Sequence, residues 1–455
     1  MVMSSEQQYI DLFEQFRNVI CEHSSEAMNA VREKAFERFV AQGFPSKKVE
    51  RYKYTDIAKL FEPDYGLNLN RLEIPVDPYE TFRCDVPNLS TNLYFVVNDA
   101  FYSKGQPKGQ KLRAGGGHHT GILPDGVIIG SLKEFASTEY YNQLAGESGD
   151  AITDLNTMLA QDGLYVFVPR DVKVDRAIQV INILRSDVDL MVNRRVLIIL
   201  EEGAEMKLLF CDHAADDRHF MTTQVIEAFV GNGAHLDLYC LEETHHKNVR
   251  VSNVYIDQQR DSRVTHNIIT LHNGVTRNQL NLSFSGKGAE CHCYGCVIAD
   301  KQQHVDNNTL ITHHVSHCTS EELYKYVLND KAVGAFAGRV LVEPGAQKTT
   351  SQMTNQNLTA TREARMFTQP MLEIYADDVK CAHGSTVGQL NDDALFYMRQ
   401  RGISLDEARV LLQNAFINEV VDKIELTPLR DRLHHLVEKR FRGELNKCEG
   451  CKLCK

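Results

Sequence analysis

A Gly-Ala turn followed by an apolar strand recurs through the middle of this chain. Gly203-Ala204, Gly233-Ala234 and Gly288-Ala289 precede the segments EMKLLFC, HLDLYCL and ECHCYGCV. A degenerate copy, DSRVTHNIITL, has Arg263 at the alanine place, which gives successive intervals of 30, 29 and 26 residues. Gly345-Ala346 before QKTTSQMTN is a further copy. A repeat of this length indicates stacked coils, in which each coil covers the apolar face of its neighbour.

The segment between about Leu164 and Val379 contains short strand patterns and almost no helical pattern. Strands without crossover helices favour a mainly β fold built as a β-helix-like solenoid, with an antiparallel sandwich as the alternative. A chain of 455 residues is also longer than the chains that usually fold around one hydrophobic core. We expect a mixed, helix-rich region over 1–160, the solenoid over 161–385, and a helical region with a cysteine-containing tail over 386–455.

Alignment of the copies on their turns predicts which side chains face the core. Strand side chains alternate between two faces, so the second and fourth residues after each Gly-Ala turn share one face. The inward residues are Met206, Leu236 and Cys291 at the second place and Leu208, Leu238 and Cys293 at the fourth. Cys291 and Cys293 are then buried small apolar residues. We expect His292 to point outward, as Lys207 and Asp237 do.

The segment LEIYADDVKCAHG, from Leu372, alternates apolar and polar residues, as a half-buried strand does. If Asp378-Val379 takes the turn place, Cys381 and His383 fall on the inward positions of the last coil. One interpretation is a buried cysteine and histidine that close the core. A last coil has no successor to cover it, however, so both side chains could instead face a metal or another subunit.

The solenoid pattern ends near Thr386, where helical patterns begin. Asn391 is expected to open a helix through Arg399, and Gly402 suits a left-handed C-terminal position. Ser404 and Glu407 have the spacing of a capping box for a second helix. The apolar face predicted for this second helix contains Ala408, Leu411, Leu412, Ala415, Phe416 and Val420.

A third helix is expected to begin at Pro428 and to end at Gly443. At the other end of the chain, residues 9–61 have helical patterns, and Gly43 ends the most amphipathic of them. Short strands are expected over 93–99 and 126–132.

Composition and charge narrow the class of protein. The formal net charge of −11 argues against a nucleic-acid partner, which would require a basic surface. There is no apolar run long enough to cross a membrane, and the acidic N-terminus is unlike a signal peptide. The twelve cysteines do not form a disulfide framework, and several lie within strand patterns, as reduced thiols do. We therefore expect a cytoplasmic protein.

Several motifs contain possible metal ligands. His313, His314, His317 and Cys318 lie together in THHVSHC, although neighbours on a strand point to opposite faces. The pairs His118-His119 and His245-His246 are weaker, because adjacent histidines rarely reach one ion. The tail CEGCKLCK places Cys448, Cys451 and Cys454 at a spacing that suits zinc or an iron–sulfur cluster, but a fourth ligand is missing. Polar loop residues and a flexible end with exposed thiols are the alternatives. Common nucleotide and hydrolase motifs are absent from the sequence.

The segment ADDVKCAHGSTVGQLNDDALFYMRQRGIS closely resembles the hallmark of the SufB/SufD family of iron–sulfur assembly proteins, on the SufD side. The segments over 334–358 and 43–57 support the resemblance, although Tyr52 stands where the family commonly has Trp. Gly384 favours SufD, because SufB-type proteins have Glu there. Ala382 and Ser385 exchange the more usual Ser and Ala, and the resemblance does not explain the cysteine tail.

The resemblance implies a right-handed parallel β-helix between helical regions. It also implies a non-catalytic scaffold that pairs with a SufB-like subunit and binds a SufC-like ATPase through its C-terminal helices. A transient iron–sulfur cluster or iron would be held at the subunit interface by His383, with Cys381 as a tentative neighbour, and the chain itself would bind no nucleotide. A homodimer in isolation is possible. The helix residues implied in ATPase binding are Leu395, Phe396, Tyr397, Arg399, Arg401 and Gly402.

Two alternatives from other classes remain open. A β-helix carbohydrate-active enzyme or acyltransferase would show a cluster of carboxylates and basic residues along a groove, or a strict hexapeptide period. Neither is visible in the sequence. A homomeric metal-binding or iron-delivery protein would bind iron alone through the histidine clusters and the cysteine tail.

Overall fold

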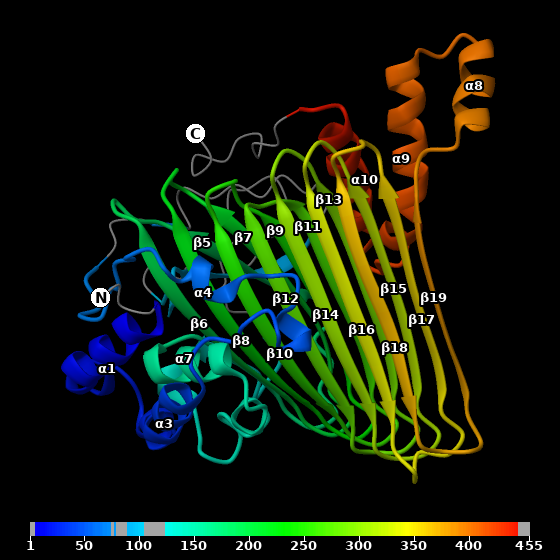
Figure 1. Ribbon diagram of the computed structural model, residues 1–455. Coiled ribbons are helices and arrows are strands. Elements are labelled where there is room, and N and C mark those ends of the chain that lie inside the picture. Colours follow the sequence, from blue (N-terminus) through cyan, green and yellow to red (C-terminus); the bar gives the residue numbers. More distant parts are fainter. Residues whose placement is uncertain (1–4, 74–76, 79–88, 104–122, 445–455) are drawn as a thin grey trace.

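The computed structural model describes residues 5–73, 77–78, 89–103 and 123–444. Two sheets of long parallel strands form the body of the molecule, with helices at both chain ends (Figure 1). Successive strands alternate between the sheets, whose orders are β19-β17-β15-β13-β11-β9-β7-β5-β1-β2 and β18-β16-β14-β12-β10-β8-β6-β4-β3. The mainly β fold with a parallel solenoid core is therefore confirmed, and the antiparallel sandwich is wrong.

The ten-stranded sheet contains β1 (Thr91–Val97), β2 (Ala100–Phe101), β5 (Ala177–Leu184), β7 (Glu205–Ala214), β9 (His235–Glu243), β11 (Arg263–His272), β13 (Glu290–Ala299), β15 (Thr319–Leu328), β17 (Thr350–Thr359) and β19 (Lys380–Gly388). The nine-stranded sheet contains β3 (Ile128–Ser131), β4 (Leu164–Val168), β6 (Leu190–Leu200), β8 (Phe220–Val230), β10 (Val249–Gln258), β12 (Val275–Phe284), β14 (His304–His313), β16 (Val333–Val342) and β18 (Arg365–Ile374).

The turns that enter the ten-stranded sheet share one backbone feature. A residue with positive φ stands two places before strands β7 to β17, at positions 203, 233, 261, 288, 317 and 348, so the coils repeat at 30, 28, 27, 29 and 31 residues. Glycine occupies three of these positions, and Asp261, His317 and Lys348 occupy the others. The sequence alignment was therefore wrong at three points. The alignment placed Arg263 at the alanine position of its turn, one residue away from its true position. It also took Gly345-Ala346 for the turn that lies at Lys348, and it did not find the coil that contains β15.

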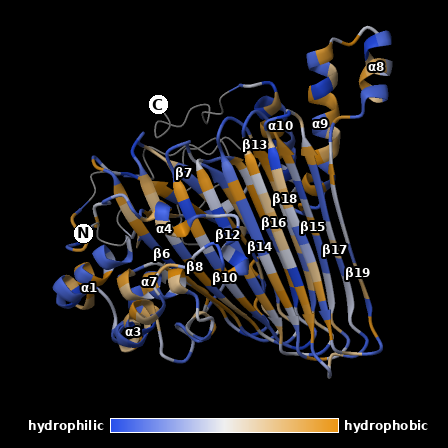
Figure 2. Ribbon diagram, viewed as in Figure 1, coloured by the Kyte–Doolittle hydropathy of each residue, from blue (hydrophilic) through white to orange (hydrophobic). Residues whose placement is uncertain are grey.

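The solenoid interior is apolar over most of its length. Inward residues that are paired from coil to coil form a column through the solenoid. Leu208, Leu238 and Cys293 of one such column are fully buried, and Figure 2 shows apolar residues running through the strands of both sheets. Cys291 is also fully buried, and His292 faces outward beside Glu321 at 3.0 Å. The predicted register of these strands is thus confirmed. The cysteines of the described residues are all free.

N-terminal helices cover the outer face of the nine-stranded sheet (Figure 1). The hydroxyl of Thr55 donates to Asp306 on β14 at 2.6 Å, and the Arg277 guanidinium on β12 lies 3.9 Å from the Tyr52 ring centre. The amphipathic segment that ends at Gly43 contains two helices, which are separated at Val31, and Gly43 ends the second of them as expected. The elements of this region are α1 (Ser5–Glu22), α2 (Glu26–Ala30), α3 (Arg32–Gln42), η1 (Glu50–Tyr52), α4 (Ile57–Leu60), α6 (Leu132–Phe135), η2 (Ala145–Glu147) and α7 (Ala151–Leu159).

Three C-terminal helices follow the solenoid: α8 (Asp392–Gln400), α9 (Leu405–Val421) and α10 (Thr427–Phe441). The expected caps are present, since Asn391 accepts from Ala394 N and Ser404 from Glu407 N. Gly402 and Gly443 have positive φ. Apolar residues of the second half of α9 and of α10 pack in one cluster with residues of the ten-stranded sheet, among them Ile417, Val420, Leu433 and Leu436.

The predicted buried face of α9 is partly wrong. Leu411 is 41% exposed and Ala415 is exposed, whereas Ala408 and Val420 are buried as expected. The first half of the helix projects beyond the solenoid with α8 (Figure 1), so only part of its apolar surface has a sheet to pack against. The residues of α9 that are buried are Ala408, Val410, Gln413, Ile417, Val420 and Val421.

Candidate functional site

The last coil of the solenoid is formed by β18 and β19, which are the edge strands of their sheets at the same end of the molecule. The segment LEIYADDVKCAHG is therefore two strands and a turn over 375–379, which corrects the expectation of a single strand. Exposed apolar side chains gather on this coil: Phe367, Ile374, Tyr375 (63% exposed) and Val387 (50% exposed). Exposed strand edges present unpaired backbone groups to which another chain can bind. This end of the solenoid is consequently a candidate interface.

Cys381 and His383 lie on the inward positions of β19, as predicted. Cys381 is paired with Ser351, and His383 with Met353, on β17. Met353 is fully buried, whereas His383 in the next coil is exposed and Cys381 is half-buried. The same column that forms the core in the interior therefore ends in an accessible imidazole, because no further coil covers it.

Polar groups surround these two residues. The hydroxyls of Thr368 on β18 and Ser385 on β19 are 2.7 Å apart, and that of Thr368 is also 2.7 Å from Asn355 Oδ1. Burial raises the pKa of the Cys381 thiol, and a backbone contact at Ser351 opposes this shift. The thiol is therefore largely protonated at neutral pH, and a bound metal would have to displace its proton. His383 is the more readily available ligand.

The column behind His383 contains buried polar residues. His266, Cys293, Glu322 and Met353 occupy it on β11, β13, β15 and β17. Burial lowers the pKa of His266 to about 4 and raises that of Glu322 to about 7. Neither ring nitrogen of His266 nor either carboxylate oxygen of Glu322 has a hydrogen-bond partner among the described residues. Our sequence alignment did not place Glu322, because the turn before its strand contains His317 rather than glycine.

Replacement of Glu322 by glutamine should stabilise the protein at pH 8 and have little effect at pH 5. The folded state raises the pKa of this carboxyl from 4.5 to about 7, so it binds a proton more tightly than the unfolded chain does. Its contribution to stability therefore falls as the pH rises through this range, by up to about 3 kcal/mol. Urea unfolding at both pH values measures the difference.

The matched control is Glu321→Gln on the same strand. Glu321 faces outward between His292 and Lys423, and these partners lower the pKa of its carboxyl despite partial burial. Its loss should give no gain in stability at pH 8. An equal effect of Glu322→Gln at both pH values would contradict the assignment.

The other histidine motif does not form a site. His313 points inward and its Nε2 lies 3.0 Å from Ser320 Oγ, whereas His314 points outward and pairs with Glu343. His317 lies in a turn, and the buried Cys318 thiol donates to Gly286 O. In the part of the chain that the structure describes, no group of three or more His, Cys, Asp and Glu side chains is placed to hold a metal ion. His118, His119, Cys448, Cys451 and Cys454 lie outside the described residues.

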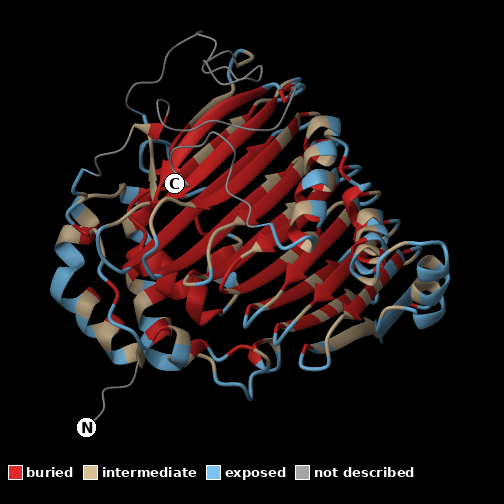
Figure 3. Cartoon of the chain, turned by 90° about the horizontal axis from the view of Figure 1, so that it is seen from above, coloured by how far each residue is buried: buried red, intermediate tan, exposed pale blue. Residues whose placement is uncertain are grey.

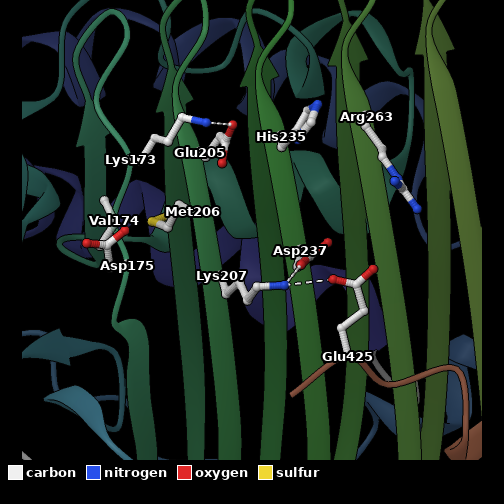
Figure 4. Close-up of a pocket in the computed structure, with 10 residues that line it drawn as sticks. All are labelled: Lys173, Val174, Asp175, Glu205, Met206, Lys207, His235, Asp237, Arg263 and Glu425. Atoms are coloured by element: carbon white, nitrogen blue, oxygen red, sulfur yellow. Dashed lines mark hydrogen bonds and ion pairs between the residues drawn. The ribbon is translucent and has the colours of Figure 1, made fainter. Parts of the chain in front are cut away.

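A cavity of about 340 Å³ lies where the α9–α10 linker meets the ten-stranded sheet (Figure 4). Lys207 Nζ lies 2.6 Å from Asp237 Oδ2 and 2.8 Å from Glu425 Oε2 in the linker. Lys173 pairs with Glu205 at 2.6 Å on the other side of the cavity. The Lys207–Glu425 ion pair therefore ties the linker to the solenoid at the edge of this cavity.

Exposed and half-buried residues make up the whole of α8, the first helix of the α8–α9 hairpin (Figure 3). No residue of α8 is buried, and Phe396 and Tyr397 are 62% and 56% exposed. The Arg401 guanidinium lies 5.1 Å from the Tyr397 ring centre. Such an apolar surface on a projecting helix is typical of a partner-binding site.

Comparison with known proteins decides the family. Residues 183–416 match the family described as "SUF system FeS cluster assembly, SufBD core domain", and residues 3–180 match "SufBD protein N-terminal region". The chain belongs to the SufBD family. The resemblance found in the sequence is thus confirmed, and a role in iron–sulfur cluster assembly follows from it.

Curated relatives cover most of the chain. A SufBD family protein of Synechocystis is 26% identical over 87% of this chain and 87% of its own length. The iron-sulfur cluster assembly protein SufD of Escherichia coli is 25% identical over 90% of this chain and 92% of its own. The chloroplastic protein ABCI7 of Arabidopsis thaliana is 25% identical over 91% and 86%. Among the described residues, no helix is long and apolar enough to cross a membrane.

Proposed function

We propose that this chain is a SufD-like scaffold subunit that pairs with a SufB-like subunit through its last coil. The uncovered last coil supports this proposal. Its inward residues His383 and Cys381 have no further coil stacked on them, and they lie beside the free edges of both sheets. A partner that continued both sheets would satisfy the edge strands and cover Tyr375 and Val387. The location we propose is the cytoplasm.

The nascent iron–sulfur cluster, as the cargo of the complex, would be bound between the two subunits. Imidazole and thiolate are both iron ligands, and His383 and Cys381 lie two residues apart on one face of β19. Two side chains fill only a few of the coordination positions that the iron atoms of a cluster offer to protein ligands. The partner subunit would therefore have to supply the remaining ligands, which makes the site a shared one.

The α8–α9 hairpin would bind a SufC-like ATPase. Its exposed residues include Phe396, Tyr397, Arg399, Arg401 and Gly402, and Leu395 is half-buried. The helices that follow the hairpin are fixed to the ten-stranded sheet by two ion pairs, Glu419 of α9 with Lys325 on β15 and Glu425 of the linker with Lys207 on β7. ATP-driven association of two ATPase subunits would then open the scaffold interface to iron and persulfide sulfur. The chain itself would be non-catalytic.

Anaerobic co-expression with the SufB-like and SufC-like proteins of the same organism tests this function. We expect a stable ternary complex that forms a cluster from ferrous iron, a persulfide donor, a reductant that converts the persulfide sulfur to sulfide, and ATP, and that transfers the cluster to an apo-ferredoxin. The chain expressed alone should form at most a homodimer through its free edges. Iron loading by the isolated chain, without gain from the other subunits, would instead support the homomeric iron-delivery protein.

A further inference from the structure

The outer face of the nine-stranded sheet contains a cavity of about 270 Å³, between the strands and the segment 49–51. A column of amide side chains crosses the strands here. Gln279 on β12 is paired with Asn308 on β14, and Gln369 lies in the same column on β18. Between Asn308 and Gln369 the column has Ala337 on β16, whose side chain is too short to continue it. The cavity lies over this gap, because Ala337 and its amide neighbours all line it.

The amide of Asn308 presents a hydrogen-bond acceptor to this cavity. Asn308 is 5% exposed, and its Nδ2 donates to Asp306 Oδ1 at 2.7 Å. A carboxylate can only accept, so this contact fixes the orientation of the amide and turns Asn308 Oδ1 away from Asp306. Among the described residues, Asn308 Oδ1 has no hydrogen-bond partner. A ligand that fits the cavity would therefore present an O–H or N–H group at this point.

Two guanidinium groups, those of Arg51 and Arg339, also line the cavity. Each has one carboxylate neighbour, at 3.8 Å and 3.3 Å respectively, and each side chain is 39% exposed. A guanidinium has five N–H donors in a planar fork, so both groups retain donors for a further carboxylate. The carboxylate of Glu50 lies in the same lining, but its Oε1 already accepts from Gln369 Nε2 at 2.8 Å. The lining therefore favours an anionic ligand.

We propose that this cavity binds a small hydroxycarboxylate with two carboxylate groups. The carboxylates would pair with Arg51 and Arg339, and the hydroxyl would donate to Asn308 Oδ1. A hydroxyl suits this acceptor better than an ammonium group does, because the two guanidinium groups repel a cation. The volume of about 270 Å³ suits a small organic acid, since it lies below the range of pockets for drug-sized ligands. The inference is independent of the proposed role in cluster assembly.

Malate and succinate test the proposal, because the two dicarboxylates differ only by one hydroxyl group. Titration calorimetry with the full-length protein should show one malate bound per chain. Succinate should bind about tenfold more weakly, since it leaves Asn308 Oδ1 without a donor. Asn308→Leu should bind the two acids with equal affinity. Arg339→Gln should weaken the binding of malate about tenfold, because it removes a charge-assisted contact.

Ala337→Gln tests the cavity itself, because the longer side chain would continue the amide column into the space for the ligand. This variant should not bind malate, and its melting temperature without ligand shows that it folds. Arg365→Gln is the matched control for Arg339→Gln, since Arg365 is an exposed arginine of β18 outside the cavity lining, and it should leave binding unchanged. The proposal would be overturned if the wild-type protein did not bind malate or bound malate and succinate equally. Unchanged malate binding by both Arg339→Gln and Ala337→Gln would also overturn it.

Discussion

Replacement of His383 by alanine is expected to reduce cluster formation on the assembled complex at least tenfold while the complex remains intact. His383 is exposed on the last coil, and a Cβ added at the neighbouring Gly384 would meet no atom within 4 Å, so this part of β19 is open. The change therefore removes the proposed iron ligand without leaving a cavity in the core. Cluster yield is measured by visible absorbance and acid-labile sulfide after anaerobic reconstitution, and complex integrity by gel filtration.

Two variants make this result specific to the proposed ligand. His235→Ala removes another exposed solenoid histidine, on the outward face of β9, and should leave the yield unchanged. Cys381→Ser should lower the yield less than His383→Ala does, since the thiol is half-buried and its pKa is raised. A His383→Ala complex with the wild-type yield would refute the assignment of His383 as a cluster ligand.

The repeat predicted the solenoid because every coil must bury the apolar side chains on one face of its strands. Leu208, Leu238 and Cys293 satisfy this rule, and from them the inward positions of Cys381 and His383 could be inferred. Glycine, in contrast, is only one way to make the turn. Where Asp261 and His317 take positive φ, the residue pattern does not reveal it, and the coil containing Glu322 was missed.

Exposure of the candidate site could not be obtained from residue types. Met353 and His383 occupy the same column, and only the absence of a following coil separates a buried residue from an accessible one. The α9 helix shows the same effect, since Leu411 has the apolar character of a core residue and lies where the helix has left the sheet. In both cases burial depends on which element lies opposite, which is a property of the tertiary structure.

The exposed aromatic surface of α8 provides the second prediction of large effect. Phe396→Asp should weaken binding of the SufC-like ATPase about 30-fold or more, since an aromatic residue at the centre of an interface contributes about 2 kcal/mol and a buried carboxylate adds a penalty. Phe396 is 62% exposed and has no packing role in the isolated chain, so the variant should fold normally.

Titration calorimetry with the purified ATPase measures the affinity, and pairing with the SufB-like subunit should be unaffected. Phe16→Asp is the matched control, because Phe16 is an exposed helical phenylalanine on α1, away from the hairpin. ATP-stimulated cluster formation should fall in parallel with ATPase binding, because the proposed function has the ATPase act on the scaffold through this hairpin. If Phe396→Asp binds the ATPase as tightly as Phe16→Asp does, the proposed docking of the ATPase on the hairpin is wrong.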